Sequence, residues 1–286
     1  MSDSNERDTV SRRRLLKIGG ASAVGLTGLT TVSGTVTAQS FMQSCQASFQ
    51  ADVPDDFPTF YNGELQGKWP ESPDELVQFS HGWTQEKRGY PQIGESMAYV
   101  FGQSLQHEGY NTNVAGNVYN ASRIYGKSVE DSKDAGRRAA DWLAGYMDSN
   151  PGMTVHLAGH SNGGPAVLAM LNRLAELEKQ VATASLLGPA AENDTVTKGW
   201  FSKGEFYDGV KNGAEEVHNY YSENDGVLGI VYRLAPATRD SALGFKGADG
   251  KTPSNYHDHD VTDLVSNHCQ YFVPGEGCMS EVVSNL

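Results

Sequence analysis

A serine stands where an apolar run meets a helical pattern. Residues 154–164 read TVHLAGHSNGG, in which Gly159, Ser161 and Gly163 fit Gly-x-Ser-x-Gly. In a sharp strand-to-helix turn of this kind, side chains two residues either side of the serine would collide, so glycine is needed there. The first N–H groups of the following helix favour negative charge near the hydroxyl. Ser161 is therefore predicted to be a nucleophile for acyl transfer, although a glycine-rich turn with an incidental serine is the simpler alternative.

Three further stretches carry residues that could assist a nucleophilic serine. Residues 81–83 (HGW) end an early apolar run, residues 222–228 (SENDGVL) follow a late one, and His268 follows the last. With the serine turn, they make residues 72–275 resemble the α/β-hydrolase family, in which the order along the chain is Ser, Asp or Glu, His. The resemblance implies a serine hydrolase that cleaves carboxylic esters of small molecules through an acyl-enzyme and needs no cofactor.

The resemblance implies that Asp225 is the acid of this set. It lies in the loop after the run 217–221, where the family places its carboxylate. Asn-Asp-Gly is also a turn signal by itself, and Glu223 and Asp194 are rival carboxylates.

The resemblance likewise implies that His268 is the base, because it follows the last expected strand. His257 and His259 compete for this role, but they fall within that strand. The run His-Asp-His-Asp at 257–260 also has ligand types that can hold a metal ion, so a metal-dependent hydrolase using His257 and His259 is an alternative. Metallohydrolases of related spacing have a further histidine directly after such a run, whereas Val261 stands there, and no metal site is predicted.

An oxyanion hole requires two backbone N–H donors. In the family one comes from the residue after the nucleophile, here Asn162, and one from the loop after the early strand, which makes Trp83 the expected second donor. Gly82 allows the backbone to turn its amide inward. His81 is expected to form hydrogen bonds in this turn and not to take part in catalysis.

Around these stretches, apolar periodicity predicts strands that alternate with helices. Strands are expected at 75–80, 113–118, before Gly159, and at 181–187, 217–221 and 255–261. Helices are expected at 94–107, at 129–147 with Ser128 as N-cap, after Ser161, and at 203–215. This alternation predicts an α/β fold with a mainly parallel sheet and helices on both faces. Residues 229–253 could form a loop or small cap over the site.

The N-terminus resembles a twin-arginine export signal. Residues 11–17 read SRRRLLK and precede a weakly apolar stretch to residue 37, with cleavage expected after Ala38. We therefore expect a signal peptide at 1–38, an N-terminal segment at 39–71 and the hydrolase domain at 72–286. The mature protein would be secreted and not stably inserted in a membrane; retention of the signal as an anchor is the alternative.

The charge balance restricts the partners. Removal of residues 1–38 takes away five of 22 basic and three of 35 acidic residues and moves the net charge from −13 to −15. So acidic a chain is repelled by nucleic acid and by anionic lipid, and salt would screen its self-repulsion. In these features it resembles secreted proteins of salt-loving archaea.

Three cysteines remain after the predicted cleavage. An exported protein can oxidise a pair of them, and the odd count leaves one spare. Cys269 and Cys278 would close a short loop and are the favoured pair, with Cys45 joined to one of them as the alternative.

The substrate is left open between esterase and lipase substrates. A different class of function also fits the resemblance, namely a catalytically silent surface or binding protein that retains the fold.

Overall fold

The computed structural model describes residues 48–84, 92–120, 125–229 and 241–286. The chain divides into two compact units, Met1–Thr35 and Val36–Leu286, and every described residue belongs to the second. The twin-arginine stretch, Cys45 and residues 230–240 of the predicted cap lie outside the described residues. Within the described part of the chain, no helix is long and apolar enough to cross a membrane.

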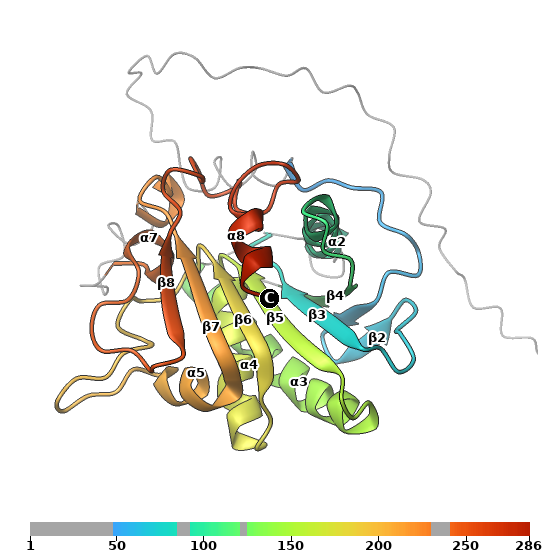
Figure 1. Cartoon of the computed structure of the whole chain (residues 1–286), viewed down its shortest axis with the longest axis horizontal. Helices are drawn as coiled ribbons and strands as arrows, with labels where there is room; N and C mark the ends of the chain where they lie inside the picture. Colours follow the sequence, from blue (N-terminus) through green and yellow to red (C-terminus); the bar gives the residue numbers. More distant parts are fainter. Residues whose placement is uncertain (1–47, 85–91, 121–124, 230–240) are drawn as a thin grey trace, which may run out of the picture. The chain divides into compact units, whose positions relative to one another are not determined.

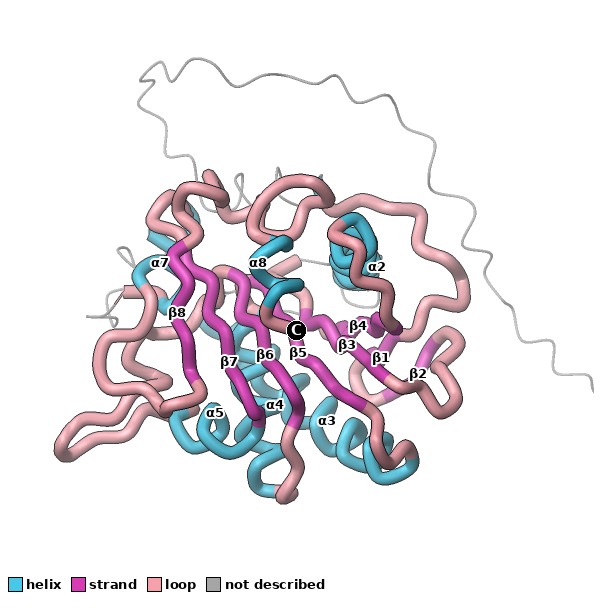
Figure 2. Tube along the Cα trace, in the orientation of Figure 1, coloured by secondary structure: helices cyan, strands magenta, loops and turns pink. Residues whose placement is uncertain are grey.

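One eight-stranded sheet forms the centre of this unit (Figures 1 and 2). Its strand order is β2-β1-β4-β3-β5-β6-β7-β8, and every neighbouring pair is parallel except β1 with β2. The strands are β1 Thr59–Tyr61, β2 Glu64–Gln66, β3 Glu75–Ser80, β4 Asn113–Val118, β5 Thr154–His160, β6 Val181–Leu187, β7 Ala214–Tyr221 and β8 Tyr256–Asp260.

Helices cover both faces of the sheet, as Figure 1 shows. α3 (Tyr125–Ser149), α4 (Gly163–Glu176) and α5 (Tyr207–Gly213) pack on one another and on one face. α2 (Gln92–His107) and the short α8 (Met279–Ser284) lie on the other. The α/β fold with a mainly parallel sheet and helices on both faces is thus confirmed, and it is the architecture that the α/β-hydrolase resemblance implies.

The central strands are buried on both faces because successive side chains point in opposite directions. On β3, Leu76 belongs to the core under α3 and α4, whereas Val77 and Phe79 belong to the core under α2 and α8. All three side chains are 0 % exposed. Burial on both sides explains why these strands read as continuous apolar runs and not as alternating patterns.

The predicted strands and helices are present, with three differences. α3 begins at Tyr125, so Ser128 lies inside the helix and does not cap it. α5 covers only part of the helix expected at 203–215, because Lys198 and Lys203 pair as a β-bridge before it and β7 begins at Ala214 after it. The N-terminal segment expected at 39–71 supplies β1 and β2 to the same sheet.

The favoured cysteine pair is wrong. Cys269 is disulfide-bonded, whereas Cys278 is a free thiol. Cys278 is 0 % exposed in the core beside α8, and its thiol donates a hydrogen bond of 3.5 Å to the carbonyl oxygen of Tyr271. Burial also raises the pKa of this thiol, so Cys278 behaves as a small apolar core residue.

Candidate active site

Ser161 lies in the turn between β5 and α4, in the strained conformation expected of a nucleophile. Its φ is +55°, in the left-handed region that residues other than glycine rarely occupy. The Ser161 N–H donates to the Leu187 carbonyl at 3.1 Å, and its carbonyl accepts from the N–H groups of Gly164 and Ala190 at 2.9 and 3.0 Å. These backbone bonds hold the turn and place the serine at the carboxyl end of β5.

The two motif glycines are required by close approach of the backbone. A Cβ on Gly159 would lie 2.4 Å from the carbonyl oxygen of Gly163, and a Cβ on Gly163 would lie 2.0 Å from the carbonyl oxygen of Ser80. Real Cβ atoms do not come so close to a backbone atom, so the turn would have to open. The collision predicted from the sequence is therefore found, and it involves the end of β3 as well as the turn itself.

Gly163→Ala is expected to destabilise the fold by about 3 kcal/mol or more, because backbone on β3 must move to admit the methyl group. Gly145→Ala is a matched control: it lies in α3 with nothing within 4 Å of the new Cβ. That change should stabilise the protein by about 0.5–1 kcal/mol through the lower entropy of the unfolded chain. Urea denaturation of both variants measures the difference, and equal stabilities would contradict the prediction.

A hydrogen-bonded chain joins Ser161, His268 and Asp225. The distance between Ser161 Oγ and His268 Nε2 is 2.9 Å, and that between His268 Nδ1 and Asp225 Oδ2 is 2.6 Å. His268 and Asp225 are 0 % exposed and Ser161 is 4 % exposed. Because a carboxylate only accepts hydrogen bonds, Nδ1 carries the proton of the neutral imidazole and Nε2 accepts the serine proton.

Asp225 lies in the loop that follows β7, and its carboxylate is held on both oxygens. Oδ1 accepts the N–H of Leu228 at 3.0 Å, and Oδ2 lies 3.3 Å from the hydroxyl of Tyr271 in addition to His268. The rival carboxylates Glu223 and Asp194 are exposed. Among the three, Asp225 is the one that the structure brings to the imidazole.

His160, which was not predicted to be a site residue, holds His268 through a hydrogen bond to its backbone. Its Nε2–H donates to the backbone carbonyl of His268 at 2.8 Å, and the two rings lie 4.8 Å apart. Burial, with the neighbouring His268 as a second cause, lowers the pKa of His160 well below its usual value. His160 therefore stays neutral and adds no positive charge next to the His268 imidazole. The only feature of the sequence that could have pointed to His160 is its position directly before Ser161 in the motif.

Asn162 and Gly82 lie next to Ser161. Asn162 precedes α4, whose first N–H groups have no partner within the helix. Gly82 approaches the serine closely, since a Cβ placed on it would lie 3.1 Å from the Cβ of Ser161. Trp83 follows Gly82 directly in the chain and stays the predicted second donor.

His81 and Tyr119 hold the loop that carries Gly82 and Trp83. His81 Nδ1 donates to the Gly82 carbonyl at 2.6 Å, and Nε2 accepts the Tyr119 N–H at 3.1 Å. The Tyr119 hydroxyl donates to the His81 carbonyl at 2.8 Å, and the two rings stack 4.2 Å apart. His81 thus has a structural position in the turn, and both of its ring nitrogens are engaged in its neutral form.

Acid is expected to destabilise the protein through His81. Burial lowers the pKa of His81 from 6.5 to about 4, so between these values the unfolded chain binds a proton that the folded chain does not. His81 alone should therefore lower the unfolding free energy by up to about 1.4 kcal/mol per pH unit, about 1.5–2 kcal/mol between pH 6.5 and 5. Denaturation at several pH values should show a shallower fall for His81→Gln than for the native protein. The exposed His107→Gln serves as control, and an unchanged slope in His81→Gln would contradict the prediction.

His257 and His259 lie on the edge strand β8 and contact other partners. His257 Nε2 lies 2.6 Å from a carboxylate oxygen of Glu216, and His259 Nε2 lies 3.0 Å from Nδ1 of His218. Among the described residues, no group of three or more histidine, cysteine, aspartate or glutamate side chains is arranged to hold a metal ion. The structure does not bring either histidine into the chain of hydrogen bonds at Ser161.

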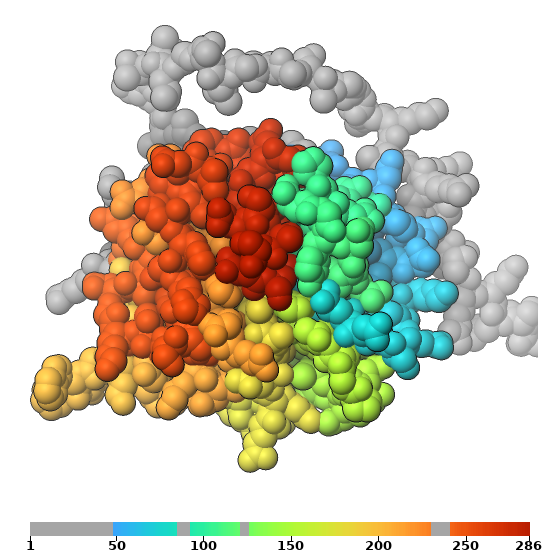
Figure 3. Space-filling view, in the orientation of Figure 1, coloured from blue at the N-terminus to red at the C-terminus, as the bar shows by residue number. Residues whose placement is uncertain are grey.

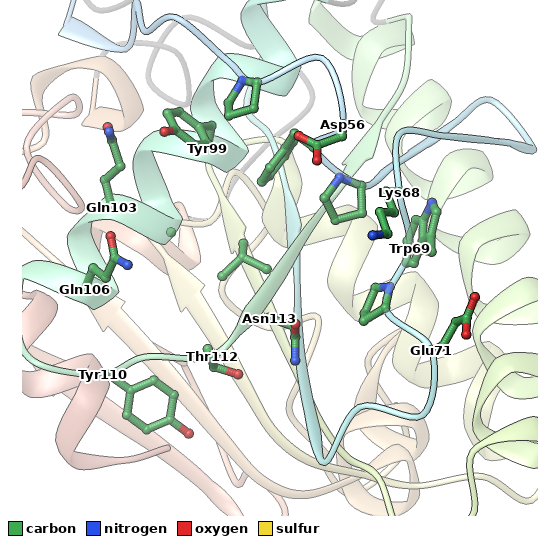
Figure 4. A pocket seen from close by; sticks show the side chains of 16 residues that line it. Asp56, Lys68, Trp69, Glu71, Tyr99, Gln103, Gln106, Tyr110, Thr112 and Asn113 are labelled. Carbon is green, nitrogen blue, oxygen red and sulfur yellow. The ribbon is translucent and has the colours of Figure 1, made fainter.

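A cavity of about 710 Å³ lies beside the amino-terminal end of β4 (Figure 4). Its lining includes Tyr99 and Gln103 on α2 and Thr112 and Asn113 where β4 begins. Ser161, in contrast, follows the carboxyl end of β5, and β4 and β5 both run parallel to β3. This cavity is therefore separate from the serine site.

Comparison with known proteins gives only distant similarity. No family model matches the chain, and no curated protein matches it. Among solved structures it is similar to an esterase from Pyrobaculum calidifontis (11 % identity, TM-score 0.43, 90 % of this chain and 94 % of that one). It is also similar to an arylesterase (15 %, 0.44, 87 % and 87 %) and to the carboxylesterase CesB from Bacillus subtilis (13 %, 0.40, 86 % and 95 %). At this level of similarity, a function has to be argued from the site itself.

Proposed function

We propose that this protein is a serine hydrolase that cleaves carboxylic esters through a covalent acyl-enzyme. The observation that carries the proposal is the buried chain from Ser161 Oγ to His268 Nε2 at 2.9 Å and from His268 Nδ1 to Asp225 Oδ2 at 2.6 Å. A nucleophile next to a base, with the base oriented by a third group, is the arrangement that activates a hydroxyl for acyl transfer. The strained φ of Ser161 also supports its proposed role as the nucleophile.

Each residue has a role in the proposed reaction. Ser161 Oγ attacks the acyl carbon while its proton passes to His268 Nε2. Asp225 accepts the Nδ1–H of His268 and stabilises the imidazolium that forms. The C–O bond to the alcohol then breaks, and the alcohol leaves with the proton from Nε2. Water, deprotonated by the same nitrogen, hydrolyses the acyl-enzyme and restores the serine.

The N–H groups of Asn162 and Trp83 are proposed to stabilise the negative oxygen of the tetrahedral intermediates. The N-terminus of α4 adds a partial positive charge on the same side. Donors fixed in a buried site stabilise this charge more strongly than water does, because they need no reorganisation when the charge develops.

Labelling with a fluorophosphonate tests the proposal. The reagent should modify the native protein, mass spectrometry should place the adduct on Ser161, and labelling should abolish hydrolysis of a soluble acyl ester. Native protein that resists labelling at both low and high salt would favour a silent binding protein with this fold. Activity that survives Ser161→Ala but is lost on adding a chelator would favour the metal-dependent alternative at His257 and His259.

Export by the twin-arginine pathway is a further part of the proposal. It rests on residues 11–17 and on the weakly apolar stretch after them. Expression of the whole chain in a host with this pathway, followed by N-terminal sequencing of protein from the medium, tests both secretion and cleavage after Ala38. A replacement of Arg12, Arg13 and Arg14 by lysine should retain the protein in the cell.

A further inference from the structure

Two adjacent aromatic side chains are fully exposed at the tip of a loop. Trp200 is 96 % exposed and Phe201 is 103 % exposed, whereas most other large apolar side chains of the described residues are buried. They belong to residues 197–204, here called the aromatic loop. Figure 1 shows this loop extending away from the sheet beside α5 and β8, and Figure 3 shows that it stands out from the surface.

The aromatic loop is held by backbone hydrogen bonds that present its tip. The Gly199 N–H donates to the Ser202 carbonyl at 2.9 Å, which makes Trp200 and Phe201 the two central residues of a tight turn. The Gly204 N–H donates to the Thr197 carbonyl at 2.8 Å. Central turn positions normally carry Gly, Pro, Asn, Asp or Ser, so two large aromatic residues break a strong local preference. Residues that contradict the local sequence preference in this way are expected at functional sites.

Lysines surround the base of the aromatic loop. Lys198 and Lys203 flank the tip and pair as a β-bridge, and Lys198 also pairs with Lys251. All three lysines are exposed. Lys203 forms an ion pair with Asp208, while the Nζ of Lys198 lies 6.0 Å from the ring centre of Tyr207. The loop is thus basic at its base in a chain whose net charge is −13.

We propose that the aromatic loop anchors the protein peripherally to a lipid bilayer, with Trp200 and Phe201 inserted among the head groups. Tryptophan and other aromatic side chains are preferred at the membrane–water boundary, and lysines beside them can contact lipid phosphates. A protein partner is a poorer fit, because a stable protein interface buries about 800 Å² on each side and this convex tip offers two side chains. A bilayer needs no such large complementary surface, so two aromatic side chains can insert at any point on it. The anchor is independent of the proposed hydrolase activity.

Vesicle binding tests the proposal on the compact unit Val36–Leu286, which lacks most of the apolar N-terminal stretch. Partition into phosphatidylcholine vesicles, with and without phosphatidylglycerol, is measured by co-sedimentation at low and high salt. The double variant Trp200→Ser/Phe201→Ser should bind at least about tenfold more weakly, since burial of each aromatic ring is lost. Leu65→Ser is the matched control, because Leu65 is an exposed apolar residue elsewhere, at 51 %, and it should bind like the native protein.

Fluorescence separates insertion from adsorption. Trp200 emission should shift to the blue on binding, and Trp200→Phe should keep the binding within about twofold but lose the shift. Lys198→Gln/Lys251→Gln should weaken binding to the vesicles with phosphatidylglycerol and leave binding to phosphatidylcholine alone unchanged. Native protein that binds neither vesicle, or a double aromatic variant that binds as well as native, would overturn the proposal. A native dimer that the double aromatic variant does not form, without vesicle binding, would overturn it in favour of contact between two copies.

Discussion

Ser161→Ala and His268→Gln are each expected to lower kcat/KM for a soluble acyl ester by about 10⁵- to 10⁶-fold. In the proposed reaction the hydroxyl and the imidazole act as one unit, since Ser161 Oγ lies 2.9 Å from His268 Nε2 and its proton passes to that nitrogen during the attack. The double variant should therefore be no slower than either single variant. Steady-state kinetics with purified proteins measures all three.

Glutamine is chosen at position 268 because it can still donate a hydrogen bond to the buried Asp225, which would otherwise lose the hydrogen bond from His268. Thermal denaturation should show that both single variants are folded. A double variant much slower than the single variants would show that the two side chains act independently. Such a result would contradict the proposed transfer between them.

Asp225→Asn should lower kcat by about 10⁴-fold while the fold is retained. The aspartate accepts the Nδ1–H of His268 at 2.6 Å and thereby leaves Nε2 free to accept the serine proton. An asparagine amide can instead donate to Nδ1, which places the imidazole proton on Nε2 and removes the base. The loss should appear in kcat, because the orientation matters in the transition state.

The rival carboxylates provide the controls for this variant. Glu223→Gln and Asp194→Asn change exposed side chains, and each should stay within about twofold of native activity, as expected for surface changes. A loss of about 10⁴-fold in either of them, with Asp225→Asn active, would move the acid to that residue and disprove the assignment.

Much of the fold could be predicted from local sequence patterns. Continuous apolar runs indicated strands buried on both faces, as at Glu75–Ser80 and Val181–Leu187. Helical periodicity indicated the helices between them, and alternation of the two implied a mainly parallel sheet. Short elements were harder to predict. β1 and β2 have three residues each and depend on pairing with strands distant in the chain, which leaves little local signal.

The candidate residues of the site could also be predicted from the sequence, because the turn around Ser161 requires glycine at fixed positions. Gly159 and Gly163 are needed wherever such a turn forms, whatever surrounds it. The order of the acid and the base along the chain then restricted the choice to a few residues in two loops.

Only the tertiary structure decided which of those residues meet. His268 is 107 positions from Ser161 and 43 from Asp225. Their contacts depend on how the loops after β7 and β8 lie next to the carboxyl end of β5. The support of His268 by His160 and the free state of Cys278 likewise follow from packing between distant segments. A sequence pattern records the conformational preference of neighbouring residues, whereas contacts such as these are set by the whole chain folding around one core.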